Sequence, residues 1–174
     1  MSGKYRCVFA DPPWRYDNKG GRAQPKYETL TVEEICKLGA LVECFAADNS
    51  HLWLCVTNSF LIEGVHNVVA GAWGFNPKQI LTWCKARFGF GNWLRNSTEH
   101  VVLCVRGRLP PLNRNVPTHI ITPNTAHSVK PQALFNAISS VSPGPRIELF
   151  ARTQRDGWDN WGLEAPSGVW KPNN

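Results

Sequence analysis

Short apolar runs alternate with amphipathic segments along most of the chain. The apolar runs, rich in β-branched and aromatic residues, are typical of buried strands; they cover Tyr5–Ala10 and residues 51–57, 80–85, 101–105 and 147–150. The amphipathic segments favour helices and cover residues 31–42, 60–72 and 131–141. Because strands alternate with helices over short connections, the pattern predicts an open, Rossmann-like α/β sheet covered by helices.

Local signals support the helix boundaries. Thr31 and Glu34 have the spacing of a capping box, which opens a helix. Pro131 stands where the first turn of a helix tolerates proline, and the Ser-Pro-Gly-Pro sequence at 142–145 ends that helix.

The length and composition indicate one folded domain. The chain has 174 residues, of which 43% are hydrophobic and 18% charged, and this composition excludes a disordered polyampholyte. We expect a single domain over residues 1–174, with its core at about 5–164 and a short tail at 165–174. No stretch approaches the roughly 18 apolar residues of a membrane span, and the first residues lack the apolar centre of a signal peptide. We therefore expect an intracellular protein without a membrane partner.

The six cysteines and five histidines are dispersed along the chain. No two cysteines form a Cys-x-x-Cys pair, and several lie inside apolar runs. We interpret them as small buried side chains in a reducing compartment rather than as zinc ligands, and we expect no metal.

Charge is distributed unevenly along the chain. The net charge is +6; residues 85–114 carry six basic side chains and one acidic one, whereas residues 28–63 carry six acidic side chains and one basic one. If the basic residues of 85–114 share one face of the protein, that face fits a polyanion such as a nucleic acid. The alternative is an ordinary solvated surface that carries charges of both signs. Segments without periodicity at 17–26, 86–96 and 107–115 read as surface loops. The candidate substrate contacts from the basic region are Lys85, Arg87, Arg106, Arg108 and Arg114.

The sequence Asp11-Pro12-Pro13-Trp14 directly after the first strand is the most informative motif. The two prolines remove two backbone donors and restrict the residues before them to extended conformations. The turn therefore presents acceptors, the Asp11 carboxylate and nearby carbonyls, beside the flat indole of Trp14. Such a site suits the exocyclic amine of a nucleobase. The alternative is a strand that ends at prolines, with a capping aspartate and a core tryptophan.

Further motifs follow in order along the chain. They are Tyr27-Glu28-Thr29-Leu30, residues 52–57 and 81–85, Glu99-His100, residues 127–131, Ser142-Pro143-Gly144, residues 146–152 and residues 158–162. With the Asp-Pro-Pro-Trp motif, they make residues 5–164 resemble the MT-A70 family of adenine-N6 methyltransferases, including its small bacterial and phage members. The resemblance implies a methyltransferase sheet with permuted motif order, in which the catalytic strand comes first, and it implies S-adenosyl-L-methionine as the cofactor.

The resemblance also implies roles for individual residues. The catalytic motif is Asp11, Pro12, Pro13 and Trp14, in which Asp11 and the Pro12 carbonyl hold the adenine amine. Trp14 or Tyr27 lines the base pocket. The residues implied to surround the cofactor are Asp11, Lys130, Glu148, Phe150, Arg152, Asn160 and Glu164, with Lys130 neutralising its carboxylate. Each of two assignments has an alternative. Lys130 could be a solvated lysine at the start of a helix, and Arg152 could form a structural ion pair with an acidic residue.

One position departs from the family pattern. Gly162-Leu163-Glu164 stands where the family often has Gly-Asn-Glu or Gly-Asn-Gln, and leucine offers the ribose no hydrogen bond. Three functions stay open: adenine-N6 methylation of DNA, which we favour; the same reaction on RNA; and a catalytically silent nucleic-acid-binding subunit. We expect a cytoplasmic protein of a bacterium or a phage-infected cell, and either a homodimer or a heterodimer is compatible with the sequence.

Overall fold

The computed structural model describes residues 4–16, 28–89, 93–123 and 129–162. Within them, seven strands form one sheet. The strands are β1 (Tyr5–Ala10), β2 (Ala46–Val56), β3 (Asn76–Lys85), β4 (Thr98–Arg106), β5 (His119–Thr122), β6 (Arg146–Leu149) and β7 (Asp159–Trp161). The helices are α1 (Val32–Lys37), α2 (Gly39–Phe45), α3 (Asn58–Ile62), α4 (Val65–Ala72) and α5 (Gln132–Val141).

The strands lie in the order β5-β3-β4-β2-β1-β6-β7. β1 is parallel to β2 and β6, and the outer strands β5 and β7 are parallel to their neighbours. β4 differs from the other described strands because it is antiparallel to both β2 and β3. The carboxyl ends of the other strands therefore share one edge of the sheet with the amino end of β4.

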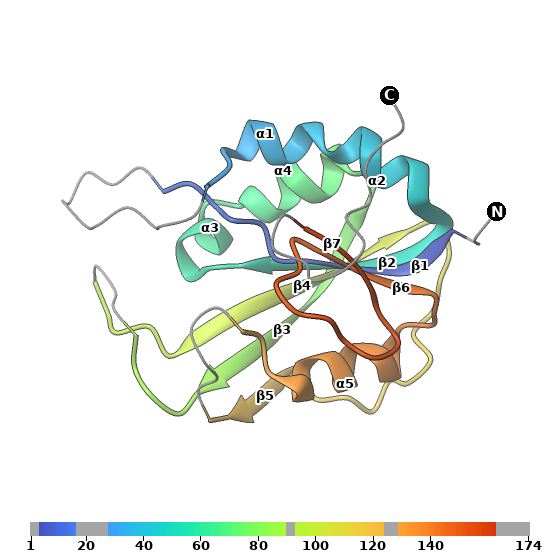
Figure 1. Ribbon diagram of the computed structural model, residues 1–174. Helices are drawn as coiled ribbons and strands as arrows, with labels where there is room; N and C mark the ends of the chain where they lie inside the picture. Colours follow the sequence, from blue (N-terminus) through green and yellow to red (C-terminus); the bar gives the residue numbers. More distant parts are fainter. Residues whose placement is uncertain (1–3, 17–27, 90–92, 124–128, 163–174) are drawn as a thin grey trace.

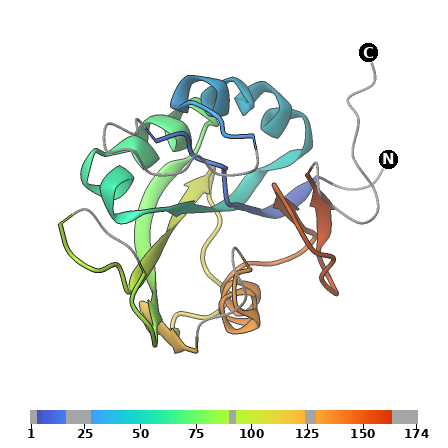
Figure 2. The ribbon, with the colours of Figure 1, turned by 60° about the vertical axis from the view of Figure 1, so that its left-hand side comes forward.

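Helices cover both faces of the sheet. The layer formed by α1, α2, α3 and α4 lies on one face, and α5 lies on the other (Figures 1 and 2). Alternating side chains of β1 supply both cores, as expected for a strand that is buried on two sides. Val8 and Ala10 belong to the core under the helical layer, whereas Cys7 and Phe9 belong to the core under α5.

These observations confirm a single Rossmann-like sheet of the α/β class. The capping box at Thr31 and Glu34 is present at the start of α1. Two helix predictions were wrong in detail. The helix expected over 60–72 is divided into α3 and α4, because Gly64 between them adopts a left-handed φ of 73°. The helix expected over 31–42 is divided at Leu38 into α1 and α2.

No described helix is long and apolar enough to cross a membrane. Among the residues that the structure describes, no group of three or more His, Cys, Asp or Glu side chains could hold a metal ion. Cys7, Cys55 and Cys104 are buried, in agreement with their interpretation as small core side chains.

Two glycines provide a direct test of how α2 packs on α4. A Cβ atom at Gly39 would lie 2.5 Å from the carbonyl oxygen of Ala72, whereas a Cβ at Gly71 would meet nothing within 4 Å. We expect Gly39→Ala to lower the free energy of unfolding by about 1–3 kcal/mol through this backbone clash. Gly71→Ala, inside α4, should raise it by up to about 1 kcal/mol. Urea unfolding followed by circular dichroism measures both, and equal stability of the two variants would contradict the packing.

Candidate active site

The candidate site lies at the edge where the parallel strands end. Asp11 directly follows β1, Lys85 ends β3 and Phe150 directly follows β6. Because β4 is antiparallel, its second residue, Glu99, reaches the same edge. Lys130 arrives there from the segment that leads into α5. This is the edge at which open α/β sheets bind ligands.

The two prolines form a turn that a second segment holds in place. The Pro12 carbonyl accepts a hydrogen bond from the Trp14 N–H at 2.9 Å, and the Pro13 carbonyl accepts one from the Leu30 N–H at 2.8 Å. The Leu30 carbonyl in turn accepts from the Arg15 N–H at 2.8 Å. A carbonyl oxygen has two lone pairs, so Pro12 keeps acceptor capacity for a ligand.

Trp14 is a core residue. Its side chain is only 6% exposed and packs at 5.1 Å from the ring of Phe60, while its indole N–H donates to the Cys55 carbonyl at 3.1 Å. The expectation that Trp14 offers an open stacking surface beside the acceptors is therefore wrong, and the core interpretation is correct. The indole anchors the turn, because its apolar ring packs under the helical layer and its N–H group donates to a backbone carbonyl.

Asp11 shares the ammonium group of Lys130 with Glu99. The Lys130 Nζ atom lies 2.5 Å from Asp11 Oδ2 and 3.2 Å from Glu99 Oε2. Glu99 also forms an ion pair with Lys85 through its other oxygen, Oε1. Within the described residues, the second oxygen of Asp11 makes no hydrogen bond. The Lys130 side chain is only 11% exposed, which excludes the solvated-lysine interpretation.

The electrostatics of this group favour its charged form. Burial acts to lower the pKa of Lys130, but the opposing charges of Asp11 and Glu99 outweigh it and hold that pKa above its usual value. Burial likewise acts to raise the pKa of Glu99, yet Lys130 and Lys85 keep it below its usual value. At neutral pH, Lys130 and Glu99 are therefore both ionised.

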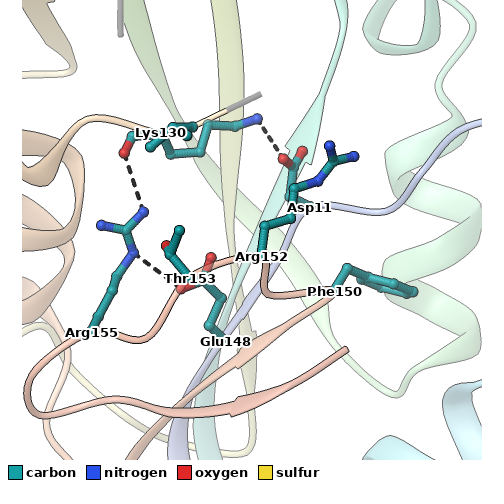
Figure 3. Close-up of a pocket in the computed structure, with 8 residues that line it drawn as sticks. Asp11, Lys130, Glu148, Phe150, Arg152, Thr153 and Arg155 are labelled. Carbon is teal, nitrogen blue, oxygen red and sulfur yellow. Dashed lines mark hydrogen bonds and ion pairs between the residues drawn. The ribbon is translucent and has the colours of Figure 1, made fainter. Parts of the chain in front are cut away.

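A hollow with about 310 Å³ of empty space, part of it open to solvent, lies beside Asp11. Its lining includes four residues that the family resemblance had assigned to the cofactor besides Asp11 itself. The lining residues are Asp11, Val129, Lys130, Glu148, Phe150, Arg152, Thr153 and Arg155. Figure 3 shows Asp11 and Lys130 pointing toward one another at one side of this group, with Glu148 and Arg155 on the opposite side.

Arg155 and Glu148 form a second, largely buried contact, a hydrogen bond whose donor is the charged guanidinium. Arg155 Nε donates to Glu148 Oε2 at 3.1 Å, and one of its terminal nitrogens donates to the Lys130 carbonyl at 3.2 Å. Its guanidinium also lies 3.8 Å from the ring centre of Phe135. Burial raises the pKa of Glu148 to about 7, even though Arg155 opposes this shift.

Sequence reasoning missed two residues of the site. Glu99 belonged to a quoted motif without a role, because its place at this edge depends on the direction of β4. Arg155 lies in no motif, and its contacts with Glu148 and the Lys130 backbone depend on how the chain turns after β6. That turn includes Phe150 with a left-handed φ of 61°, a costly conformation for a residue with a side chain.

Other predicted site residues lie outside the hollow. Asn160 is the register partner of Glu148, but its side chain donates to Gln154 and does not line the hollow. Tyr27 and Glu164 lie outside the described residues, as does the departing Leu163. Arg87 is exposed in the segment after β3, near the site edge.

Three predicted substrate contacts lie at the opposite edge of the sheet. Arg106 ends the antiparallel strand β4, where its guanidinium donates to the Trp73 carbonyl and covers the ring of Phe75. The exposed Arg108 and Arg114 follow it in the segment that contacts the end of α5 through Leu112. The reversed direction of β4, which the sequence pattern did not reveal, therefore places these three arginines away from Asp11. Their assignment as substrate contacts stays a prediction.

Comparisons with known proteins show similarity to one family over most of the chain. The model of the MT-A70 family matches residues 5–164. The type II methyltransferase M.MunI of a Mycoplasma species is 32% identical over 187 aligned residues, which cover 94% of this chain and 78% of that protein. The METTL3 subunits of N(6)-adenosine-methyltransferase from Danio rerio and Homo sapiens are 32% and 31% identical, over 86% of this chain. The chain spans about a quarter of those two proteins, at 26% of each.

The raised pKa of Glu148 predicts how stability changes with pH. Between pH 4.5 and about 7, the folded chain keeps a proton on Glu148 that the unfolded chain has released, so the free energy of unfolding falls as the pH rises through this window. Glu148→Gln removes this titration. The stability of the variant relative to the parent should therefore rise by up to about 3 kcal/mol across the window. Urea unfolding at both ends of the window measures this, and a pH-independent difference would contradict the burial of an ionisable Glu148.

Proposed function

The chain belongs to the MT-A70 family of adenine-N6 methyltransferases, and from this premise we propose that it methylates the N6 amine of adenine in DNA. Methyltransferases of this family use S-adenosyl-L-methionine as the methyl donor. The observation that carries the proposal is the Asp11 carboxylate, which stands after a donor-free proline turn beside the hollow. One of its oxygens is held by Lys130. The other makes no hydrogen bond within the described residues, so it can accept one from an amine.

The reaction demands a more nucleophilic amine than adenine provides. The lone pair of the exocyclic nitrogen is delocalised into the ring. Asp11 and the Pro12 carbonyl each accept one of the two N–H groups, which favours a pyramidal nitrogen with a localised lone pair. When bound, S-adenosyl-L-methionine supplies an electrophilic methyl group, and the residues around the hollow hold the two reactants in line.

Asp11 acts mainly through its charge. The amine nitrogen gains positive charge during methyl transfer, and a fixed carboxylate stabilises that charge as it develops. Asp11 need not be a strong base, because the proton can leave after the methyl group has moved. Its ion pair with Lys130 keeps it oriented during this step.

The chemistry of the hollow fits the proposed cofactor. Glu148 offers an acceptor for hydroxyl or amino groups, Arg152 offers a cation for a carboxylate, and Phe150 offers an aromatic surface for a purine. Lys130 lies between the hollow and Asp11, which is compatible with the contact to the cofactor carboxylate implied by the family. We assign these four residues to cofactor binding.

We choose DNA over RNA because of the similarity to a DNA-modifying relative. The type II methyltransferase M.MunI aligns with 94% of this chain, whereas the METTL3 proteins align with 86% of it. We take M.MunI as the guide to the substrate and propose duplex or single-stranded DNA.

Nucleoside mass spectrometry tests this proposal. The protein is incubated with S-adenosyl-L-methionine and, separately, with duplex DNA, single-stranded DNA and RNA. We expect N6-methyladenine in DNA. Product only in RNA would overturn the choice of polymer, whereas no product together with no saturable cofactor binding would favour a silent subunit.

Asp11→Ala tests the role of the carboxylate. We expect kcat to fall by about 10²–10³-fold, because the variant loses both an acceptor for the amine and the charge that stabilises the transition state. Cofactor affinity, measured by calorimetry, should change only a few-fold. Asp48→Ala is the matched control, since Asp48 is exposed and lies near the start of β2, next to Gly107 at the edge of the sheet opposite Asp11. Near-normal turnover by Asp11→Ala would sink the assignment.

A further inference from the structure

Four alternating charges link three strands and the start of α5. Asp11 contacts Lys130, Lys130 contacts Glu99, and Glu99 contacts Lys85. Each side chain is largely withdrawn from solvent, with exposed fractions of 31% for Asp11, 11% for Lys130, 28% for Glu99 and 23% for Lys85. Only Asp11 and Lys130 line the hollow.

Lys85 faces into the protein. Its backbone N–H donates to the Ser97 carbonyl at 2.7 Å, which fixes the residue at the base of the connection between β3 and β4. Its ammonium lies 4.8 Å from the ring centre of Trp83 and pairs with Glu99, the register partner of Trp83 on β4. Cross-strand neighbours on one face of a sheet interact in this way. Lys85 is therefore committed to an internal partner and is poorly placed to contact a phosphate.

The carboxylates of Asp11 and Glu99 compete for the Lys130 ammonium. Lys130 lies 2.5 Å from Asp11 and 3.2 Å from Glu99, so it stays closer to Asp11. Lys85 occupies one oxygen of Glu99 and offsets its charge, and this weakens the attraction of Glu99 for Lys130. Without Lys85, Glu99 would draw Lys130 toward itself and release the oxygen of Asp11 that Lys130 holds.

We propose that Lys85 is a positioning residue for methyl transfer, which acts through Glu99 to keep Lys130 on Asp11. This inference rests on the proposed function, because it concerns the orientation of the carboxylate that receives the amine. It replaces the expectation that Lys85 contacts substrate. A displaced Asp11 would lower the rate of methyl transfer without weakening the binding of DNA.

Three single variants test the role of Lys85. Lys85→Met should lower kcat by about tenfold while KM for DNA stays the same. Lys85→Arg, which keeps the charge next to Glu99, should recover most of the rate. Lys78→Met is the matched control, since Lys78 is an exposed lysine on the same strand but toward the opposite edge, and it should behave like the parent.

The salt dependence of DNA binding separates positioning from phosphate contact. A lysine that neutralises a phosphate contributes about one counterion to the slope of log Kd against log salt. We expect Lys85→Met to leave this slope unchanged. A shallower slope with a raised KM and a normal kcat would overturn the proposal and restore Lys85 as a substrate contact.

A double-variant cycle tests the path through Glu99. Glu99→Gln removes the carboxylate that competes with Asp11 for Lys130. Added to Lys85→Met, it should therefore restore most of the rate that Lys85→Met loses, because Lys85 acts only through the Glu99 charge. A double variant that is as slow as Lys85→Met, or slower, would overturn the coupling. Absence of product with the parent protein would overturn the proposed function and this inference with it, whereas an active parent and an equally active Lys85→Met variant would overturn the inference alone.

Discussion

The sharing of the Lys130 ammonium between Asp11 and Glu99 is the interaction on which the site depends. It joins the end of β1, the start of β4 and the approach to α5 at one point. A cation with an exposed fraction of 11% is costly to desolvate, and here two carboxylates compensate for that cost. The same contact leaves one oxygen of Asp11 available and sets its direction. This ion pair therefore joins three elements of the fold and also orients the carboxylate that we propose binds the amine.

The strand directions make this contact possible. In a sheet whose strands were all parallel, Glu99 would lie at the opposite edge, and Lys130 would have Asp11 as its partner without Glu99. The reversal of β4 brings an acidic residue to the site edge and carries Arg106 away from it. The core supports the arrangement, because α5 packs through Leu134, Phe135 and Ile138 on the face of β1 that carries Cys7 and Phe9. Lys130 precedes that helix and is thereby placed over the end of β1.

The sequence predicts the sheet, most of its strands and the centre of the site because these features are local. Apolar runs identify buried strands, and a strand followed by Asp-Pro-Pro-Trp places Asp11 at a strand end. Lys130, Glu148, Phe150 and Arg152 were assigned from motif resemblance, and the structure brings them together around one hollow. The division of the two predicted helices depends on single positions, Leu38 and Gly64, that interrupt an otherwise continuous amphipathic pattern.

The remaining features depend on tertiary structure that no local pattern encodes. The direction of β4 decides the places of Glu99 and Arg106, and hydrophobic periodicity is the same for either direction. Trp14 carries an apolar ring and one polar N–H group, so its sequence context suits a stacking surface and a core position equally. The structure shows the core position, because the ring is buried against Phe60. Arg155 contacts Glu148 only because the chain turns back sharply at Phe150.

A crystal structure of the protein with S-adenosylhomocysteine, the demethylated form of the proposed cofactor, tests the central claim most directly. The account predicts the ligand in the hollow between Glu148, Phe150 and Arg152, with the Lys130 ammonium still within hydrogen-bond distance of Asp11. A ligand bound elsewhere, or a Lys130 that has left Asp11 altogether, would contradict it.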